Sequence, residues 1–289
     1  MRIMITNDDG YAARGIRVLT AAIARWAEQS SSSAPHEVIV LAPNTNFSGA
    51  AAAVGEVYSR TGIDYQRVEL DMAPHVEAYA LDASPALCTM VGCLGGLGPR
   101  PDLIVSGINH GVNVGRSVLY SGTVGAVLSG GQMGVSGLAV SMRSRKGAPL
   151  EVAASIAVSL LDDLLEAPKS TLLNLNVPSI EFAELKGIRR GRISQAGIVK
   201  QTSSVFEAAK GEPLAVGEKA TLSITLGTAV PSLGDVSDEE PDDDGALIAA
   251  GYASLTSLRG VHEDASASAD DLLRTLVSSA EAHLHAQQP

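Results

Sequence analysis

Short runs of consecutive apolar residues alternate with stretches of helical periodicity along the first 178 residues. Residues 3–5 form one such run, and the segment after it places Ile16, Leu19, Ile23 and Trp26 at helical spacing. Strands that are apolar at every position are typical of a parallel sheet covered on both faces. We therefore predict an α/β fold with a Rossmann-like, mostly parallel sheet and helices on both faces. Further buried strands are expected at 38–41, 103–105, 138–141 and 172–177, more exposed ones around 68–70 and 76–78, and helices at 85–97, 123–133 and 151–165.

The pattern changes after residue 178. Residues 187–193, 221–226 and 252–258 have the composition of strands, and long polar segments separate them. Residues 268–285 form an expected C-terminal helix with Leu272, Leu276 and Leu284 on one face. We predict an α/β core over 1–178 and a β-rich extension over 179–289 whose acidic loop and terminal helix form an association arm.

The charge of the chain excludes broad binding to nucleic-acid duplexes. Its 289 residues carry a formal net charge of -11, and aromatic residues are only 3%. Residues 235–244 hold seven acidic and no basic side chains, so the net charge of the remainder of the chain is near -4 (-11 + 7).

Cys88 and Cys93 are expected to be small core residues. The chain has no signal-peptide pattern and no uninterrupted apolar run of ~18 residues, so we expect a cytoplasmic protein without a membrane segment.

Polar residues follow two of the predicted strands. Asp8 and Asp9 come directly after the first, and two adjacent carboxylates are costly unless a cation or several donors neutralise them. The alternative is a turn in which the aspartates only cap the backbone. Gly107, Asn109 and Asn113 lie in a glycine-rich segment after the strand at 103–105. That segment would let the backbone approach an anion, or it is an ordinary turn.

A third polar cluster opens the helix expected at 123–133. Ser121, Gly122 and Thr123 stand at its start, where hydroxyls and free N–H groups can bind a phosphate. Helix capping explains the same residues equally well. Oxygen ligands without clustered cysteine or histidine favour a hard cation such as magnesium or manganese, and the six histidines show no zinc spacing.

Four motifs in order resemble the SurE survival-protein nucleotidases. The resemblance is strong from residue 1 to about 178 and weaker afterwards. Its motifs are Met1-Arg2-Ile3-Met4-Ile5-Thr6-Asn7-Asp8-Asp9-Gly10, Ala42-Pro43 with Ser48-Gly49-Ala50, Pro101-Asp102-Leu103-Ile104-Val105-Ser106-Gly107-Ile108-Asn109, and Tyr120-Ser121-Gly122-Thr123-Val124, with later landmarks at 173–178 and 251–256.

This resemblance implies a metal-dependent phosphatase that hydrolyses nucleoside 5'- and 3'-monophosphates. Asp8, Asp9, Ser48 and Asn109 would hold one divalent ion per subunit, magnesium or manganese. Asp8 and Asp9 would also be the catalytic pair. On chemical grounds we expect one of them, Asp9 by preference, to take the proton from the attacking water. The remaining site residues would bind the phosphate or the rest of the substrate: Gly107, Asn113, Ser121, Gly122 and Thr123.

The same resemblance assigns the catalytic core, with the metal and phosphate site, to residues 1–178. It implies a homodimer with exchanged C-terminal segments, or a homotetramer made of two such dimers. One departure is the run from Ala83 to Cys88, which lacks the polar pair that the family usually carries there and leaves substrate preference open.

Three alternatives differ in chemistry. A phosphatase that forms an aspartyl-phosphate would typically place two acids one residue apart, whereas Asp8 and Asp9 are adjacent. A phospho-receiver module would need an aspartate where the strand at 103–105 leads into Ser106 and Gly107. A nucleotide-binding protein without turnover fits the same motifs, and phosphate release from AMP separates it from an enzyme.

Overall fold

The computed structural model describes residues 1–30, 35–55, 62–194, 242–261, 266, 268 and 271–278. The chain divides into a compact unit over Met1–Leu258 and a second unit over Arg259–Pro289. In the second unit residues 271–278 are helical, with Leu272 and Leu276 exposed. Leu284 and the strand expected at 221–226 lie outside the described residues.

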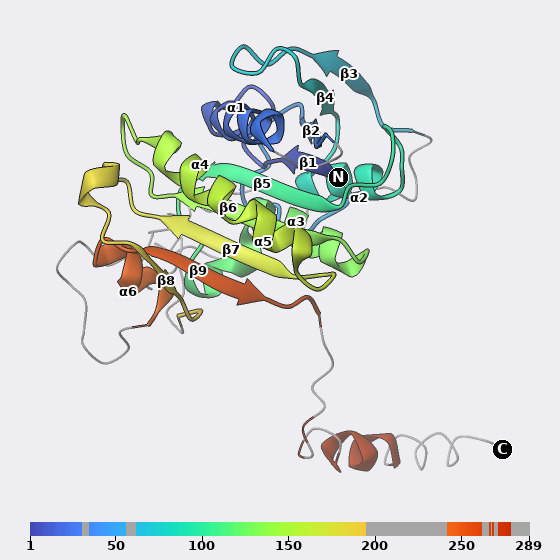
Figure 1. Ribbon diagram of the computed structural model, residues 1–289. Coiled ribbons are helices and arrows are strands. Elements are labelled where there is room, and N and C mark those ends of the chain that lie inside the picture. The colour runs from blue at the N-terminus through green and yellow to red at the C-terminus, as the bar shows by residue number, and fades with distance from the viewer. Residues whose placement is uncertain are drawn as a thin grey trace, which may run out of the picture. The chain divides into compact units, whose positions relative to one another are not determined.

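In the described residues of the first unit, one sheet of nine strands forms the centre (Figure 1). Its strand order is β3-β4-β2-β1-β5-β6-β7-β9-β8. All neighbours pair in parallel except β3 with β4 and β7 with β9, which confirms the predicted mostly parallel α/β sheet. The strands are β1 (Arg2–Thr6), β2 (Glu37–Pro43), β3 (Tyr65–Val68), β4 (Glu77–Leu81), β5 (Leu103–His110), β6 (Ser136–Met142), β7 (Leu172–Val177), β8 (Ile188–Arg190) and β9 (Ala253–Leu258).

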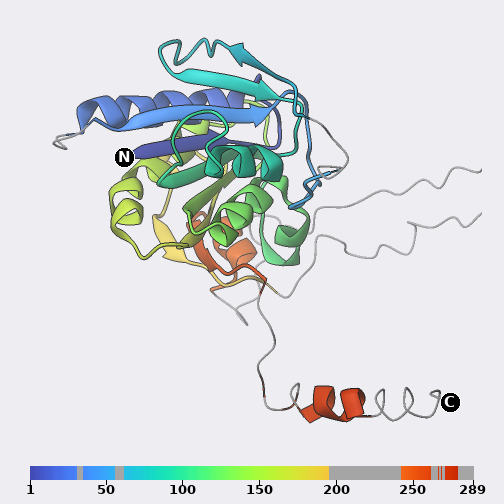
Figure 2. The ribbon, with the colours of Figure 1, turned by 90° about the vertical axis from the view of Figure 1, so that its right-hand side faces the viewer.

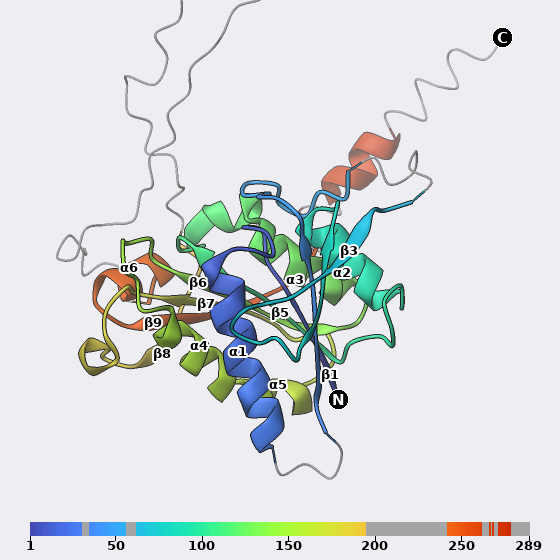
Figure 3. The ribbon, with the colours of Figure 1, turned by 90° about the horizontal axis from the view of Figure 1, so that it is seen from above.

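Helices cover both faces of the sheet, as Figure 3 shows from above. One face carries α1, α4 and α5, and the other carries α2 and α3. The helices are α1 (Arg14–Gln29), α2 (Pro85–Cys93), α3 (Gly122–Gln132), α4 (Leu150–Ser159), α5 (Leu161–Glu166) and α6 (Asp244–Ala249), with short 3-10 helices η1 (Gly115–Tyr120) and η2 (Phe182–Glu184).

The central strands are apolar on both sides because each face of the sheet has its own core. In β1, Ile3 and Ile5 belong to the core under α1 and α4, whereas Met4 belongs to the core under α2. Successive side chains of a strand point to opposite faces, so a strand buried on both sides must be apolar throughout. Cys88 and Cys93 are buried free thiols, as expected.

The sheet continues past residue 178. β9 pairs with β7 and β8 pairs with β9, so these segments extend the same sheet, at the edge opposite the β3–β4 hairpin (Figure 2). Several local features differ from the sequence prediction, among them the end of α2 at Cys93 rather than at residue 97. The helix expected at 151–165 is broken at Leu160, whose N–H bonds to Ala157 and Val158 in a tightened last turn. The acidic segment ends in α6, which the sequence pattern did not indicate.

Candidate functional site

Three loops meet at the carboxyl ends of the central strands. Asp8 and Asp9 follow β1, Ser48 lies in the loop after β2, and Asn109 lies near the end of β5. β2 and β5 flank β1 on opposite sides, so the order of the sheet reverses at β1. Ligands of open α/β sheets bind at such a reversal, outside the carboxyl ends of the strands. The structure therefore places the predicted residues where a ligand site is expected.

The Asp8 carboxylate is buried and held by the start of α3. The Thr123 hydroxyl donates to Asp8 Oδ1 at 2.6 Å, and the Thr123 backbone N–H donates to Asp8 Oδ2 at 3.1 Å. Burial raises the pKa of Asp8 above its usual value, the bonds from Thr123 oppose that rise, and the charge of Asp9 adds to it. A buried carboxylate with a raised pKa beside a second acid is typical of a functional site.

The contact between Asp8 and α3 depends on a glycine. A Cβ atom at Gly122 would lie 2.8 Å from Asp8 Cβ and 2.9 Å from Asp8 Oδ2. No side chain fits at that distance, so Gly122 allows the helix start to approach the carboxylate. Ser121 precedes it as the N-cap of α3, and its Oγ accepts a bond from Val124 N–H at 3.1 Å.

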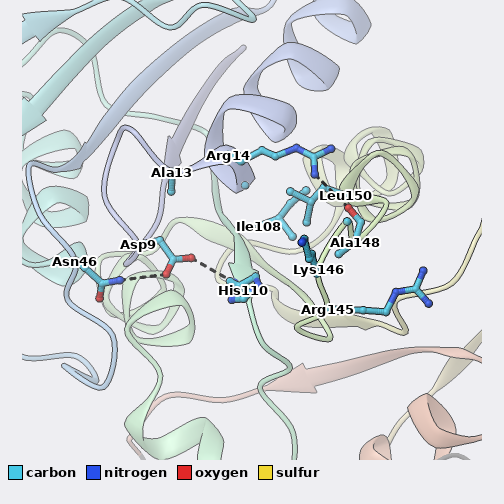
Figure 4. Close-up of a pocket in the computed structure, with 12 residues that line it drawn as sticks. Asp9, Ala13, Arg14, Asn46, Ile108, His110, Arg145, Lys146, Ala148 and Leu150 are labelled. Atoms are coloured by element: carbon cyan, nitrogen blue, oxygen red, sulfur yellow. Dashed lines mark hydrogen bonds between the residues drawn. The ribbon is translucent and has the colours of Figure 1, made fainter.

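The loop after β2 is attached to both aspartates (Figure 4). Phe47 N–H donates to the backbone oxygen of Asp8 at 2.7 Å. Asn46 Nδ2 donates to Asp9 Oδ1 at 3.4 Å, and Asn46 Oδ1 accepts from Ser48 N–H at 2.7 Å. These bonds connect the loop that carries Ser48, an exposed residue, to the two acids.

The end of β5 contacts Asp9 from the other side. His110 N–H donates to Asp9 Oδ2 at 3.3 Å, and Asn109 Nδ2 donates to the Gly111 oxygen at 2.8 Å. The second bond fixes the Asn109 amide and leaves its Oδ1 as an acceptor for a ligand. Asp9 is only partly buried and receives two long bonds, so its carboxylate is much less constrained than that of Asp8.

The structure gives three predicted phosphate-binding residues other contacts. The single hydroxyl hydrogen of Thr123 is donated to Asp8, so that group cannot donate to a phosphate at the same time. Asn113 is buried, and its Nδ2 donates to Ser141 Oγ at 2.8 Å. Gly107 has φ +140, and a Cβ there would lie 2.2 Å from the Val140 oxygen of β6. Thr123 positions Asp8, Asn113 ties its loop to the sheet, and Gly107 permits close strand contact.

A pocket of about 480 Å³ opens beside Asp9. In Figure 4 Asp9 and Asn46 lie at one end and the segment around Lys146 lies at the other. Its lining includes both charged and apolar residues: Asp9, Ala13, Arg14, Gly15, Asn46, Ile108, His110, Arg145, Lys146, Gly147, Ala148 and Leu150. The pocket is large enough to hold the organic part of a small phosphate ester.

The donor set fits a hard divalent cation. Asp8, Asp9, Ser48 and Asn109 offer carboxylate, hydroxyl and amide oxygens, the ligands that magnesium and manganese prefer. Within the described part of the chain no three histidine, cysteine, aspartate or glutamate side chains gather as a metal cluster. The set above has only two such residues, and its other members are a serine and an asparagine.

Asn46, which connects Asp9 to the loop of Ser48, was not among the residues predicted from the sequence. The sequence feature that could have indicated Asn46 is its position as the third polar residue after β2, two residues before Ser48.

The Ala83–Cys88 run, where the chain departs from the family pattern, starts α2. Ser84 caps that helix, accepting from Leu87 N–H at 3.2 Å, and its hydroxyl donates to the Ala53 oxygen. No described helix is long and apolar enough to cross a membrane.

The fold and the site define an open α/β protein with an oxygen-rich ligand site at the reversal of its sheet. A model of the family described as Survival protein SurE matches residues 3–200. The chain belongs to the SurE family.

Relatives match over nearly the whole chain. The 5'/3'-nucleotidase SurE of Cronobacter sakazakii is 35% identical over 97% of this chain and 98% of its own. The 5'-nucleotidase SurE of Pseudomonas entomophila is 34% identical over 90% of this chain and 92% of its own. The crystal structure of the SurE protein from Aquifex aeolicus aligns with a TM-score of 0.68 and 26% identity, covering 91% of this chain and 95% of that one.

Proposed function

We propose that this chain is a metal-dependent phosphomonoesterase that hydrolyses nucleoside 5'- and 3'-monophosphates to nucleoside and inorganic phosphate. Its family membership and the nucleotidase names of its relatives support this activity. The observation that carries the proposal is the geometry around Asp8 and Asp9. One carboxylate is buried and fixed by α3, and the other faces a pocket that can hold the nucleoside.

Asp8, Asp9, Ser48 and Asn109 are the residues we assign to one divalent ion per subunit, magnesium or manganese. When bound, such an ion supplies Lewis acidity toward the phosphoryl group and makes a water easier to deprotonate. Asp8 is positioned by Thr123 before any ligand arrives, so little reorganisation is needed to bind a cation. Preorganised partners of this kind orient metal ligands and strengthen binding.

Asp9 is the residue we assign as general base. Its two hydrogen bonds are 3.3 and 3.4 Å long, and it borders the pocket, so its carboxylate is free to accept a proton from an attacking water.

The start of α3, at Ser121 and Gly122, contacts Asp8. The positive end of the α3 dipole stabilises negative charge on the phosphate oxygens. Gly107 and Asn113 act by shaping the loop between β5 and α3.

We propose that the chain assembles as a homodimer or a homotetramer. The helix over 271–278 leaves Leu272, Leu273, Leu276 and Val277 more than half exposed within its own unit. Apolar side chains in such a row favour contact with another chain. Light scattering at micromolar concentration tests this, and a monomer would contradict it.

A screen for phosphate release tests the activity itself. The full chain is assayed with 5'-AMP, 3'-AMP and other mononucleotides in manganese, with EDTA as the control. We expect release that depends on the metal. A chelator selective for zinc should have little effect, because the donor set is all oxygen. Binding of nucleotides without any release would instead identify a nucleotide-binding protein.

A further inference from the structure

The pocket beside Asp9 is basic although the chain as a whole is acidic. Its lining holds three cationic side chains, Arg14, Arg145 and Lys146, against the single carboxylate of Asp9. The formal net charge of the chain is -11. A concave site with charge opposite to the rest of the protein concentrates ligands of the other sign, here anions.

The three cations are not equally available to a ligand. Arg14 donates to Glu151 at 3.1 Å, so its charge is already partnered. In Figure 4 the guanidinium of Arg145 extends away from Asp9. Lys146 lies between the labelled His110 and Ala148 in the same view. None of the ion pairs among the described residues includes Lys146. Lys146 is therefore the cation best placed to meet an anion in the pocket.

The backbone around Lys146 is fixed by a tight turn. Ala148 N–H donates to the Arg145 oxygen at 3.1 Å, and Gly147 in the turn has φ +71, a conformation that glycine adopts without strain. The turn is also linked to Asp9. The Ser144 hydroxyl contacts the ring of His110 at 3.0 Å, and His110 N–H donates to Asp9. The lysine and the proposed general base therefore belong to one connected arrangement.

In Figure 4, Ile108 lies between Asp9 and Lys146. The other apolar residues that line the pocket are Ala13, Ala148 and Leu150. A ligand that matches this order has one phosphate at the aspartates, an organic part over the apolar wall and a second anionic group at Lys146.

We propose that Lys146 forms a second-anion subsite, so that the enzyme prefers phosphomonoesters that carry another anionic group, with nucleoside 3',5'-bisphosphates as the substrate class. This inference rests on the proposed function, because it assumes that the aspartates bind the phosphate that is cleaved.

The test compares adenosine 3',5'-bisphosphate with 5'-AMP in manganese, using the full chain. We expect a higher kcat/KM for the bisphosphate. In Lys146→Gln the ratio of the two kcat/KM values should fall by roughly twofold to fivefold, as for a charged contact of an exposed side chain. Lys146→Arg should retain most of the preference. Raising the salt concentration should reduce the ratio in the unmodified chain, because exposed charges are screened.

Lys169→Gln is the matched control. Lys169 is exposed in the loop before β7, at the amino ends of the parallel strands, whereas the site lies at their carboxyl ends. Its removal should leave the ratio unchanged. The subsite would be overturned if the kcat/KM ratio of bisphosphate to 5'-AMP were near one in the unmodified chain. It would also be overturned if Lys146→Gln had the same ratio as the unmodified chain.

A binding measurement separates this inference from the proposed function. Calorimetric titration of each nucleotide with calcium in place of manganese keeps a cation at the aspartates and measures binding whether or not turnover follows. If the bisphosphate binds more tightly than 5'-AMP and Lys146→Gln removes this difference in affinity, the subsite is supported. This holds even if neither nucleotide is hydrolysed, a result that would contradict only the nucleotidase activity. Equal affinity of the two nucleotides would overturn the subsite whatever the activity.

Discussion

The Thr123 hydroxyl donates a 2.6 Å hydrogen bond to Asp8 Oδ1 across a sequence separation of 115 residues. Both residues are buried, and the backbone N–H of Thr123 reaches the other oxygen of the same carboxylate. The start of α3 therefore sets the orientation of the side chain that we assign to the metal. This contact makes Thr123 a positioning residue.

Thr123→Val should weaken metal binding. The substitution keeps the shape of the side chain and removes the donor to Asp8, and loss of such a partner typically lowers metal affinity ~10–100-fold. Titration of manganese by calorimetry measures this directly, and turnover at saturating manganese should recover in part.

Thr89→Val is the control, because Thr89 is equally buried and its hydroxyl has no hydrogen-bond partner among the described residues. Thr123→Ser should keep most of the affinity. Unchanged manganese affinity in Thr123→Val, with a weaker inhibition by inorganic phosphate, would show that the hydroxyl binds phosphate instead.

Gly122→Ala should disturb the same contact through steric overlap. The added Cβ would lie 2.8 Å from Asp8 Cβ, so either α3 or Asp8 must move. We expect lower manganese affinity and a turnover reduced by about 10²-fold, the effect of losing one preorganised group. Gly62→Ala serves as the control since a Cβ there meets nothing within 4 Å. Normal activity of Gly122→Ala would mean that the helix start does not need its close approach to Asp8.

Sequence patterns predicted the central fold because they reflect local burial. β1 and β5 are apolar throughout since both faces of the sheet are covered, and this can be recognised without knowing any long-range contact. The break at Leu160 has no such signal, because neither proline nor glycine marks it. α6 was hidden because its first residue, Asp244, ends a strongly acidic run that is typical of a solvated loop.

The position of the candidate site could be predicted from the sequence, but the roles of its residues could be predicted only in part. Residues after β1, β2 and β5 had to meet at one edge of a parallel sheet, so Asp8, Asp9 and Asn109 could be brought together from the sequence. The sequence leaves the partner of Thr123 open, because a cap, a phosphate ligand and a donor to a distant carboxylate share one local pattern. Only the contact between the start of α3 and Asp8, in the loop after β1, decides it.

Asp244 should make stability depend on pH. The carboxylate is fully buried and accepts bonds from the N–H groups of Gly115, Ser194 and Gly245. Burial raises the pKa of Asp244 above its usual value of 3.8, and the backbone bonds oppose that rise only in part. Above 3.8 the folded protein thus binds this proton more readily than the unfolded chain does.

The contribution of Asp244 to the free energy of unfolding is therefore greatest below pH 3.8 and falls as the pH rises through the folded pKa. Asp244→Asn does not titrate. Urea unfolding across this range should show the stability of the unmodified chain decreasing relative to Asp244→Asn as the pH rises. A difference that is constant or grows with pH would contradict the raised pKa.

Rapid acid quench distinguishes the two phosphatase mechanisms. If water attacks phosphorus with Asp9 as base, then no label from a phosphate-labelled nucleotide should remain on the protein during turnover. Label trapped on Asp8 or Asp9 would establish a covalent aspartyl-phosphate instead. An unlabelled protein from a quench within the first turnover is the expected result.

We assign Asp8 and Asp9 as metal ligands and as the catalytic pair of a nucleotidase. Turnover of 5'-AMP is measured at saturating manganese for Asp8→Asn and Asp9→Asn, with Asp71→Asn, an exposed aspartate paired with Arg17, as the control. We expect a loss of about 10²-fold or more in each of the first two variants and normal turnover in the third. Near-normal turnover in both Asp8→Asn and Asp9→Asn would show that the assignment is wrong.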